Sequence, residues 1–383
     1  MKFEISRDGA LKQLDAFINS ELTNYSFKRN FDLGPKDKSN VSCLSPYISH
    51  RLITEYEVAK TVLAKFPYQK VEKYIQEIFW RVYWKGWLEH RPQVWNDYYE
   101  YSDNNLNSED YKKAIEGATG IVCFDDWVEE LVNENYLHNH TRMWFASIWI
   151  FTLKLPWQLG ANFFMKHLLD GDSASNTLSW RWVAGLQTIG KHYLATASNI
   201  RKFTNNVHNP QNLNENASPL NENKIYDLID INYSNVEQSS ETLLMCDNDL
   251  SFKEREGMYA KYKYIYLVKL SNEFRRIELS DNVLNYKYSI LEEFSNNYPQ
   301  SKILNANDLK KEINTNKNFD VIYPCVGENL SFLENNKNNS KLNYIYRKED
   351  LFCWKYAKKG FFNFKKNIPL IIEKIIKTKD FFI

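Results

Sequence analysis

The hydrophobic pattern of this chain changes once along its 383 residues, and that change limits the folds it can adopt. Up to about residue 204, apolar residues recur at helical spacing, as in residues 71–91. After about residue 240, short runs rich in β-branched residues alternate with helical stretches, which is typical of a parallel α/β sheet. The sequence therefore predicts a multidomain α and α/β fold, with an all-helical domain over residues 1–204 and a smaller parallel-sheet α/β domain over residues 241–383.

Residues 205–240 separate these two parts. The segment is polar, rich in Asn and poor in residues that could form a core, so we expect a long surface loop or interdomain linker. The runs that predict the sheet strands are residues 242–247, 264–270, 301–306 and 319–326. Near the end of the chain, residues 360–377 predict an aromatic clasp followed by a helix.

The run from Met143 to Leu155 is apolar on nearly every face but too short to span a bilayer, so we expect a helix buried at the centre of the helical domain. The sequence contains no signal peptide and no apolar stretch of membrane-spanning length. Its five cysteines are widely spaced without a CxxC pair, so no metal site is predicted. We expect a reduced, cytoplasmic protein without membrane contact.

Charge and aromatic content bear on possible partners. The formal net charge is +1, so any nucleic-acid binding must come from a local patch of basic residues. Aromatic residues make up 15% of the chain, and such rings build cores but also line sites for flat ligands.

Three stretches contain candidate functional residues, and each also has a purely structural explanation. Asp170 and Asp172 stand at a helix end, where Arg142 could offset their charge, although one such Asp could simply cap the following helix. Ser42 and Ser45 precede Pro46 at an expected helix start, which suits phosphate but also suits an ordinary capped helix. The segment from Glu77 to Trp84 combines indoles with basic residues, which suits an unstacked nucleobase; an amphipathic core helix explains it about equally well.

Five motifs occur together in one order: Ser42–Tyr47, Glu77–Arg81, Gly117–Gly120, His138–Met143 and Asp170–Trp182. In this order they resemble the flavin-binding domain of the DNA photolyase and cryptochrome family, over about residues 10–204. Members of that family usually begin with an α/β domain that holds an antenna chromophore. Here the α/β pattern follows the helical part, so it could be a relocated antenna-type domain or an unrelated partner.

The resemblance implies that FAD binds between these motifs. Ser42, Leu44, Ser45 and the Tyr25 hydroxyl would hold the pyrophosphate, Asp170 would pair with Arg142 beside the isoalloxazine, and Asn176 would face flavin N5. The full set of cofactor-binding residues that it implies is Tyr25, Ser42, Cys43, Leu44, Ser45, Tyr74, Asn139, Arg142, Asp170, Gly171, Asp172 and Asn176.

The resemblance further implies a deoxyribodipyrimidine photolyase-type carbon–carbon lyase, in which light drives one electron from reduced FAD to a cyclobutane pyrimidine dimer in damaged DNA. The implied catalytic residues are Glu77, Met143, Asn176 and two tryptophans of a photoreduction chain, Trp157 and Trp180. The implied substrate-binding and DNA-binding residues are Glu77, Trp80, Arg81, Lys85, Asn139, His140 and Trp182, with Arg91 as a further phosphate contact. The outer member of the chain has no clear match, and Tyr98, Tyr99 and Tyr101 are candidates.

Two other functions fit the same motifs. One is a cryptochrome-like blue-light receptor, in which flavin photochemistry changes the C-terminal domain and its partner. The other is a photoenzyme redirected to another pigment or small molecule, which would carry a second chromophore.

Overall fold

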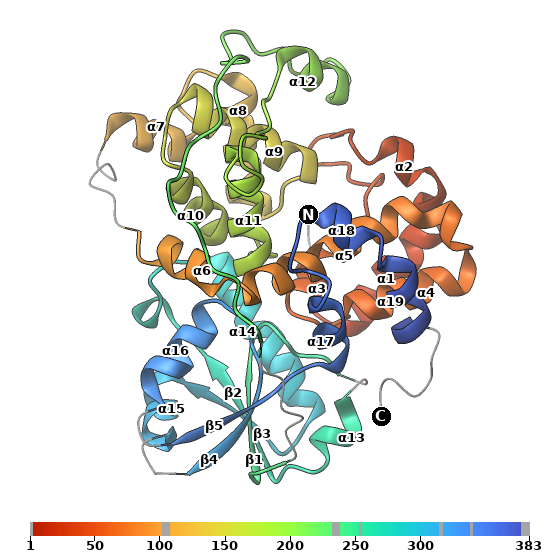
Figure 1. Ribbon diagram of the computed structural model, residues 1–383, viewed down its shortest axis with the longest axis vertical. Helices are drawn as coiled ribbons and strands as arrows, with labels where there is room; N and C mark the ends of the chain where they lie inside the picture. The colour runs from red at the N-terminus through yellow and green to blue at the C-terminus, as the bar shows by residue number, and fades with distance from the viewer. Residues whose placement is uncertain are drawn as a thin grey trace.

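The computed structural model describes residues 3–101, 108–231, 238–252, 255–313, 317–337 and 340–376. The segment predicted as a linker and the predicted C-terminal helix therefore lie partly outside the described residues. Within the described part, a helical body lies above a sheet domain, and the last helices of the chain return to the helical body (Figure 1). The fold class is the one that the sequence predicts.

The N-terminal half is built from helices. Their bounds are α1 Arg7–Ser20, α2 Tyr25–Lys28, α3 Ser45–Ser49, α4 Glu55–Lys65, α5 Tyr68–Glu89, α6 Pro92–Tyr99, α7 Glu109–Glu116, α8 Val122–Glu134, α9 Asn139–Ser147, α10 Trp157–His167, α11 Ser173–Ala184 and α12 Ala197–Phe203. Several begin at a polar cap, as where the Thr54 hydroxyl accepts from the amide of Glu57 at the start of α4.

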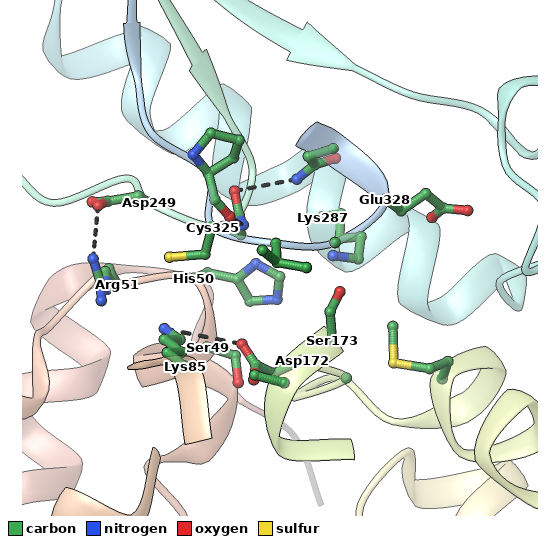
Figure 2. A pocket seen from close by; sticks show the side chains of 18 of the residues that line it. Ser49, His50, Arg51, Lys85, Asp172, Ser173, Asp249, Lys287, Cys325 and Glu328 are labelled. Atoms are coloured by element: carbon green, nitrogen blue, oxygen red, sulfur yellow. Dashed lines mark hydrogen bonds and ion pairs between the residues drawn. The ribbon is translucent and has the colours of Figure 1, made fainter. Parts of the chain in front are cut away.

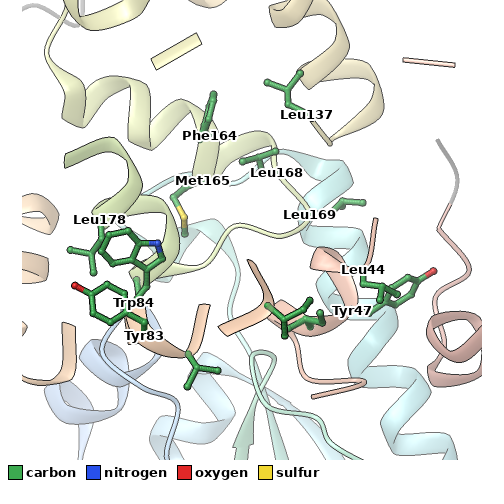
Figure 3. Close-up of a cluster of buried hydrophobic side chains, with 14 of the residues drawn as sticks. Leu44, Tyr47, Tyr83, Trp84, Leu137, Phe164, Met165, Leu168, Leu169 and Leu178 are labelled. Carbon is green, nitrogen blue, oxygen red and sulfur yellow. The ribbon is translucent and has the colours of Figure 1, made fainter. Parts of the chain in front are cut away.

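The predicted central helix is present and buried. Helix α9 continues into a π-helical turn, Ile148–Thr152, and the side chains of Trp144, Phe145 and Trp149 are fully buried. Figure 3 shows part of the same core, where Leu44 from the loop before α3 and Trp84 from α5 belong to one cluster with Phe164 from α10. The core therefore joins segments that are far apart in sequence.

The second half contains a five-stranded parallel sheet in the order β3-β2-β1-β4-β5. The strands are β1 Thr242–Cys246, β2 Tyr264–Lys269, β3 Ser301–Asn305, β4 Asn318–Ile322 and β5 Lys341–Ile345. The helices of this half are α13 Glu256–Tyr259, α14 Asp281–Asn297, α15 Ala306–Ile313 and α16 Glu328–Asn336. All four predicted strands are present; the fifth, an edge strand with half-exposed side chains, was not predicted.

The described parts of residues 205–240 contain no helix or strand; residues 205–231 contact the helical body, whereas residues 238–240 bond to the sheet domain. The amide of Leu220 donates to the carbonyl of Ala184, and the amide of Ile229 donates to the carbonyl of His90. The described part of this segment is therefore attached to the helical body at these two points.

After β5 the chain leaves the sheet and packs on α5. The helices concerned are α17 Lys348–Trp354, α18 Phe361–Lys365 and α19 Ile368–Ile371, the last continuing into a π-helical turn, Ile372–Ile376. Phe364 of α18 packs against Phe79 and Tyr83 of α5. The C-terminal helices therefore form one side of the helical body.

The carboxyl ends of β1 and β4 meet the helical body at the point where the strand order reverses. Here Arg51 is buried and pairs with the carboxylate of Asp249 at 3.0 Å (Figure 2) and with that of Asp350 at 2.7 Å. The crevice that remains has a volume of about 50 Å³. Ligands of open α/β sheets commonly bind at such a position, but ligand pockets usually exceed ~300 Å³. This crevice has room for a few water molecules rather than a pigment.

Close packing at Gly86 of α5 can be tested by substitution. A Cβ atom at this position would lie 2.5 Å from Trp354 Cδ1 and 2.8 Å from Ala357 Cβ. Gly86→Ala should therefore destabilise the protein by about 1–3 kcal/mol, despite the higher helix propensity of Ala. Gly257→Ala in α13 is the matched control, since nothing lies within 4 Å of its Cβ position. Denaturant unfolding measures both; an unchanged or raised stability of Gly86→Ala would contradict the packing.

Glu89 at the end of α5 should make stability depend on pH. Its carboxylate accepts from the amide of Val326 and the hydroxyl of Tyr323, both at 2.7 Å. Burial raises the pKa of Glu89 to about 7, since these hydrogen bonds offset only part of the desolvation. Its contribution to stability is therefore full below the ordinary pKa near 4.5 and is lost as the pH rises through 7.

Glu89→Gln keeps the side-chain shape without the charge. Relative to the wild type, this variant should become more stable by about 3 kcal/mol between pH 4.5 and pH 8. Denaturant unfolding across this pH range measures the difference. A stability difference between the two proteins that does not change with pH would contradict the raised pKa of Glu89.

Candidate functional site

A cavity of about 480 Å³ opens between α5 and the segment α9–α11. Its volume lies in the range of pockets for cofactors and substrates. The walls contain residues from all the predicted motifs except Gly117–Gly120. Predicted site residues that line it are Tyr25, Ser42, Cys43, Leu44, Ser45, Tyr74, Glu77, Trp80, Arg81, Asn139, Arg142, Met143, Asp170, Gly171, Asp172, Asn176, Trp180 and Trp182.

Asp170 forms the charged floor of the cavity. Its carboxylate pairs with Arg142 at 3.0 Å, and its side chain is almost fully buried. Burial by itself raises the pKa of Asp170, but the guanidinium groups of Arg142 and Arg81 outweigh it and lower the pKa below its usual value. Asp170 is therefore ionised at neutral pH and compensated by the residue that the sequence indicated.

Asp172 has the structural role that its sequence position allows. It is the N-cap of α11, where its side chain accepts from the amide of Ser175 at 2.7 Å. Burial raises its pKa, whereas Lys85 and Arg81 lower it, and the result is a lowered pKa. Capping does not exclude contact with a ligand, because Asp172 also lines the cavity.

Asn176 presents a fixed amide to the cavity. Its Nδ2 donates one hydrogen to the carbonyl of Ala161 at 2.9 Å, which fixes the amide and leaves Oδ1 and the second N–H available to a ligand. Nearby, the buried Nε1 of Trp180 and Oδ1 of Asp170 have no hydrogen-bond partner among the described residues. Buried polar atoms without partners are costly, so both indicate a polar ligand in this cavity.

Helix α5 supplies the other wall. Glu77 is paired with Arg29 at 3.2 Å and with Lys73 at 3.3 Å, and about a quarter of its side chain is exposed. Trp80 lies one turn further along, and on α11 the ring of Trp182 stacks on Tyr193. A carboxylate and two indoles thus line the same cavity from two helices.

Two predicted DNA contacts, Lys85 and His140, are buried, and a third, Arg81, lines the cavity but is bound to Ser49. Lys85 is buried, with Glu55 at 3.6 Å and Asp172 at 3.9 Å, and Arg81 donates to the hydroxyl of Ser49. Both follow Glu77 at four-residue intervals, so they share its inward face of α5. His140 is buried between Asn30 and Tyr193, and burial lowers its pKa.

Arg91 also faces inward. Its guanidinium donates to the carbonyl of Lys358 and lies over the ring of Trp87. Neither it nor the three residues above are placed to contact a phosphate on the surface.

The aromatic residues beyond the cavity form a second cluster. Trp157 is buried outside the cavity and stacks on Tyr98, with ring centroids 5.5 Å apart. Trp95 lies next to Tyr98 and stacks on Tyr99, which is partly exposed. Of the three tyrosines considered for the outer position, Tyr98 is therefore the one in contact with Trp157.

Sequence reasoning missed three residues near the cavity. Arg29 pairs with Glu77, and Tyr136 lines the cavity with the Arg142 guanidinium 5.4 Å from its ring centre. Phe361 stacks on Trp80, at 3.5 Å between ring centres and 12° between planes. The aromatic run at residues 360–364 was the available signal for Phe361, but nothing in the sequence indicated its target.

Comparison with known proteins agrees with this geometry. Residues 74–218 match the family model for the FAD binding domain of DNA photolyase. A deoxyribodipyrimidine photo-lyase of Agrobacterium fabrum is 30% identical over 184 residues, which covers 46% of this chain and 38% of that protein. That of Streptomyces griseus is 36% identical over 119 residues, covering 30% of this chain and 26% of that protein.

Residues 74–218 are thus similar to the FAD-binding domain of the DNA photolyase and cryptochrome family.

A bacterial class III photolyase from Agrobacterium tumefaciens aligns in structure with a TM-score of 0.45 and 29% identity, covering 52% of this chain and 42% of that chain. The chain thus spans less than half the length of the relatives that it matches. Within it, the family match includes Glu77, Asp170 and Asn176 but not the loop at Ser42–Ser45 or the C-terminal helices. None of the helices in the described part of the chain has the length and apolar character of a membrane span.

The cavity residues fit an FAD, since they offer an ionised pair, a fixed amide and hydroxyl groups. Asp170→Ala should abolish flavin binding, because it leaves Arg142 partly buried without its counter-ion and removes an acceptor from the cavity floor. The flavin absorbance per protein of the purified variant measures this. Asp230→Ala, at an exposed ion pair with Lys358, is the control and should stay fully loaded. A fully yellow Asp170→Ala protein would contradict the assignment.

Proposed function

We propose that this protein is a light-driven lyase that splits cyclobutane pyrimidine dimers in damaged DNA, using reduced FAD. The observation that carries the proposal is that Glu77, Trp80 and Trp182 line the same cavity as the acidic floor and Asn176. Fold kinship alone would not distinguish repair from other activities, so the proposal depends on these side chains.

When bound, FAD would supply absorption of light and the transfer of one electron, which later returns to it. Asn176 would hydrogen-bond the ring without providing a proton, because an amide is not an acid, and its bond to Ala161 would hold it in place. Asp170 and Arg142 would hold the ring by a charged pair that burial keeps from water. Ser42 and Ser45 would bind the pyrophosphate, with the Tyr25 hydroxyl beside them.

The substrate would enter as a dimer flipped out of the duplex. Trp80 and Trp182 offer flat surfaces for its two bases, and base–aromatic stacking contributes about 1–3 kcal/mol per base. Glu77 would hydrogen-bond the base edge where negative charge develops, and Arg29 and Lys73 beside it would stabilise that charge. Met143 would fill the apolar part of the pocket.

A cryptochrome-like receptor is the second candidate, and one observation favours it. The hydroxyl of Ser49 donates to the carbonyl of Asp170, and the adjacent His50 ring lies between the carbonyls of Leu169 and Asp247. The cavity floor is thus connected directly to the carboxyl end of β1, which is a route by which flavin chemistry could reach the α/β domain.

A repair assay under illumination distinguishes a repair enzyme from a light receptor. Reduced protein is mixed with an oligonucleotide that contains one thymine dimer, and restored thymine is measured after blue light and after darkness. Repair is expected only in the light. Trp80→Ala should weaken binding of the damaged oligonucleotide by roughly 5–100-fold, from the loss of one stacked base. Trp87→Ala on the same helix is the matched control, because Trp87 does not line the cavity.

Intact dimer despite a loaded, photoreducible flavin would overturn the repair proposal and leave the receptor. An absorbance band that FAD does not account for would instead support a photoenzyme redirected to another pigment.

A further inference from the structure

The C-terminal helices bring a basic segment to the wall of the cavity. Phe361 covers one face of Trp80 without lining the cavity itself, so it supports the indole from behind. Phe361 also packs edge-on against Tyr83, and Arg91 donates to the carbonyl of Lys358. These contacts hold residues 355–366, which we call the lysine turn, beside the Trp80 end of the cavity.

The lysine turn has an unusual composition for this chain. Its twelve residues, KYAKKGFFNFKK, contain five lysines and no acidic residue, whereas the whole chain has a net charge of only +1. Lys359 and Lys366 are exposed, Lys365 is half-exposed, and the ring of Phe362 is 82% exposed. Within the described part of the chain, these three lysines have no ion-pair partner; Lys358 alone in the turn is paired, with Asp230.

The position of this charge matters because two basic residues of α5 beside the cavity, Arg81 and Lys85, are already engaged within the protein. Arg81 and Lys85 face inward and are engaged by Ser49, Glu55 and Asp172. A DNA strand whose base enters the cavity must nevertheless lay its phosphates along the rim, and phosphate contacts contribute much of the affinity of such complexes.

We propose that the lysine turn is the phosphate-binding surface for DNA at this cavity, with Phe362 contacting a base or sugar between the lysines. The proposal rests on the proposed function for the choice of nucleic acid as the partner. It assigns that contact to a segment that lies outside the residues matched by the family model. Solvated lysines next to an exposed aromatic ring suit a backbone that carries alternating phosphates and flat bases.

The dependence of DNA affinity on salt tests this directly. Each lysine that contacts a phosphate of duplex DNA contributes about 0.9 to the slope of log K against log salt concentration. The variant K359A/K365A/K366A should therefore reduce the slope by about 2–3, for intact and for dimer-containing duplexes alike. Replacing the same three lysines by Arg should restore the slope, because Arg keeps the charge.

The matched control removes three exposed lysines elsewhere. K302A/K311A/K317A changes the net charge equally, at β3, at α15 and just before β4, and Figure 1 shows α15 far from α18. This control should leave the slope unchanged. Flavin absorbance should be the same in all variants, since none of these residues lines the cavity.

The outcomes separate this inference from the proposed function. If the wild type binds DNA through the turn but does not repair dimers, the DNA-binding role of the lysine turn is supported and the proposed repair function is contradicted. An unchanged slope of log K against log salt concentration in K359A/K365A/K366A, or no DNA binding by the wild type, overturns the DNA-binding role of the lysine turn. Binding of anionic phosphatidylserine vesicles but not DNA, with loss in the same variant, also overturns it and assigns the turn to a membrane surface.

Discussion

Packing on two faces of helix α5 is the constraint on which the cavity depends. One face carries Glu77, Arg81 and Trp84 into the cavity, and another packs on the C-terminal helices through Gly86 and Phe79. A shift of the helix would therefore disturb both sides together, because protein interiors are close-packed and transmit strain. The position of the cavity wall is thus set by residues almost 300 positions further along the chain.

The buried charges near the cavity depend on one another in the same way. Asp170 and Asp172 stay ionised although burial opposes it, because Arg142, Arg81 and Lys85 lie close to them. Lys85 in turn faces Glu55, which is fully buried on α4. Removing one charge from such a group leaves another charge buried without a partner. The resulting loss of folding stability is larger than the stability that the pair itself contributes. The arrangement explains why Arg81 and Lys85 of α5 face inward.

Sequence reasoning recovered what depends on local pattern. Helical spacing predicted α5 and the buried α9, and the strand-like runs predicted β1 to β4, because these patterns follow directly from which face is buried. The motif order predicted that Ser42, Glu77, Arg142 and Asp170 would meet. The DNA contacts implied for Lys85 and His140 stay predictions, and the burial of both side chains was not foreseen, since residue type indicates a preference for solvent but not the direction of a side chain. Strand β5 was missed because its side chains are half-exposed, and the target of Phe361 was unforeseeable because the contact spans more than 280 residues.

The late position of the C-terminal helices has a consequence for biosynthesis. Ribosomes release a chain from its N-terminus, and domains generally fold in that order as they emerge. Here α5 is made long before Trp354, Phe361 and Phe364, which complete its packing. Until then α5 exposes an aromatic surface, and pairings across such distances form slowly. A nascent chain of this kind would need protection from aggregation until residues 354–364 have been made and have packed on α5.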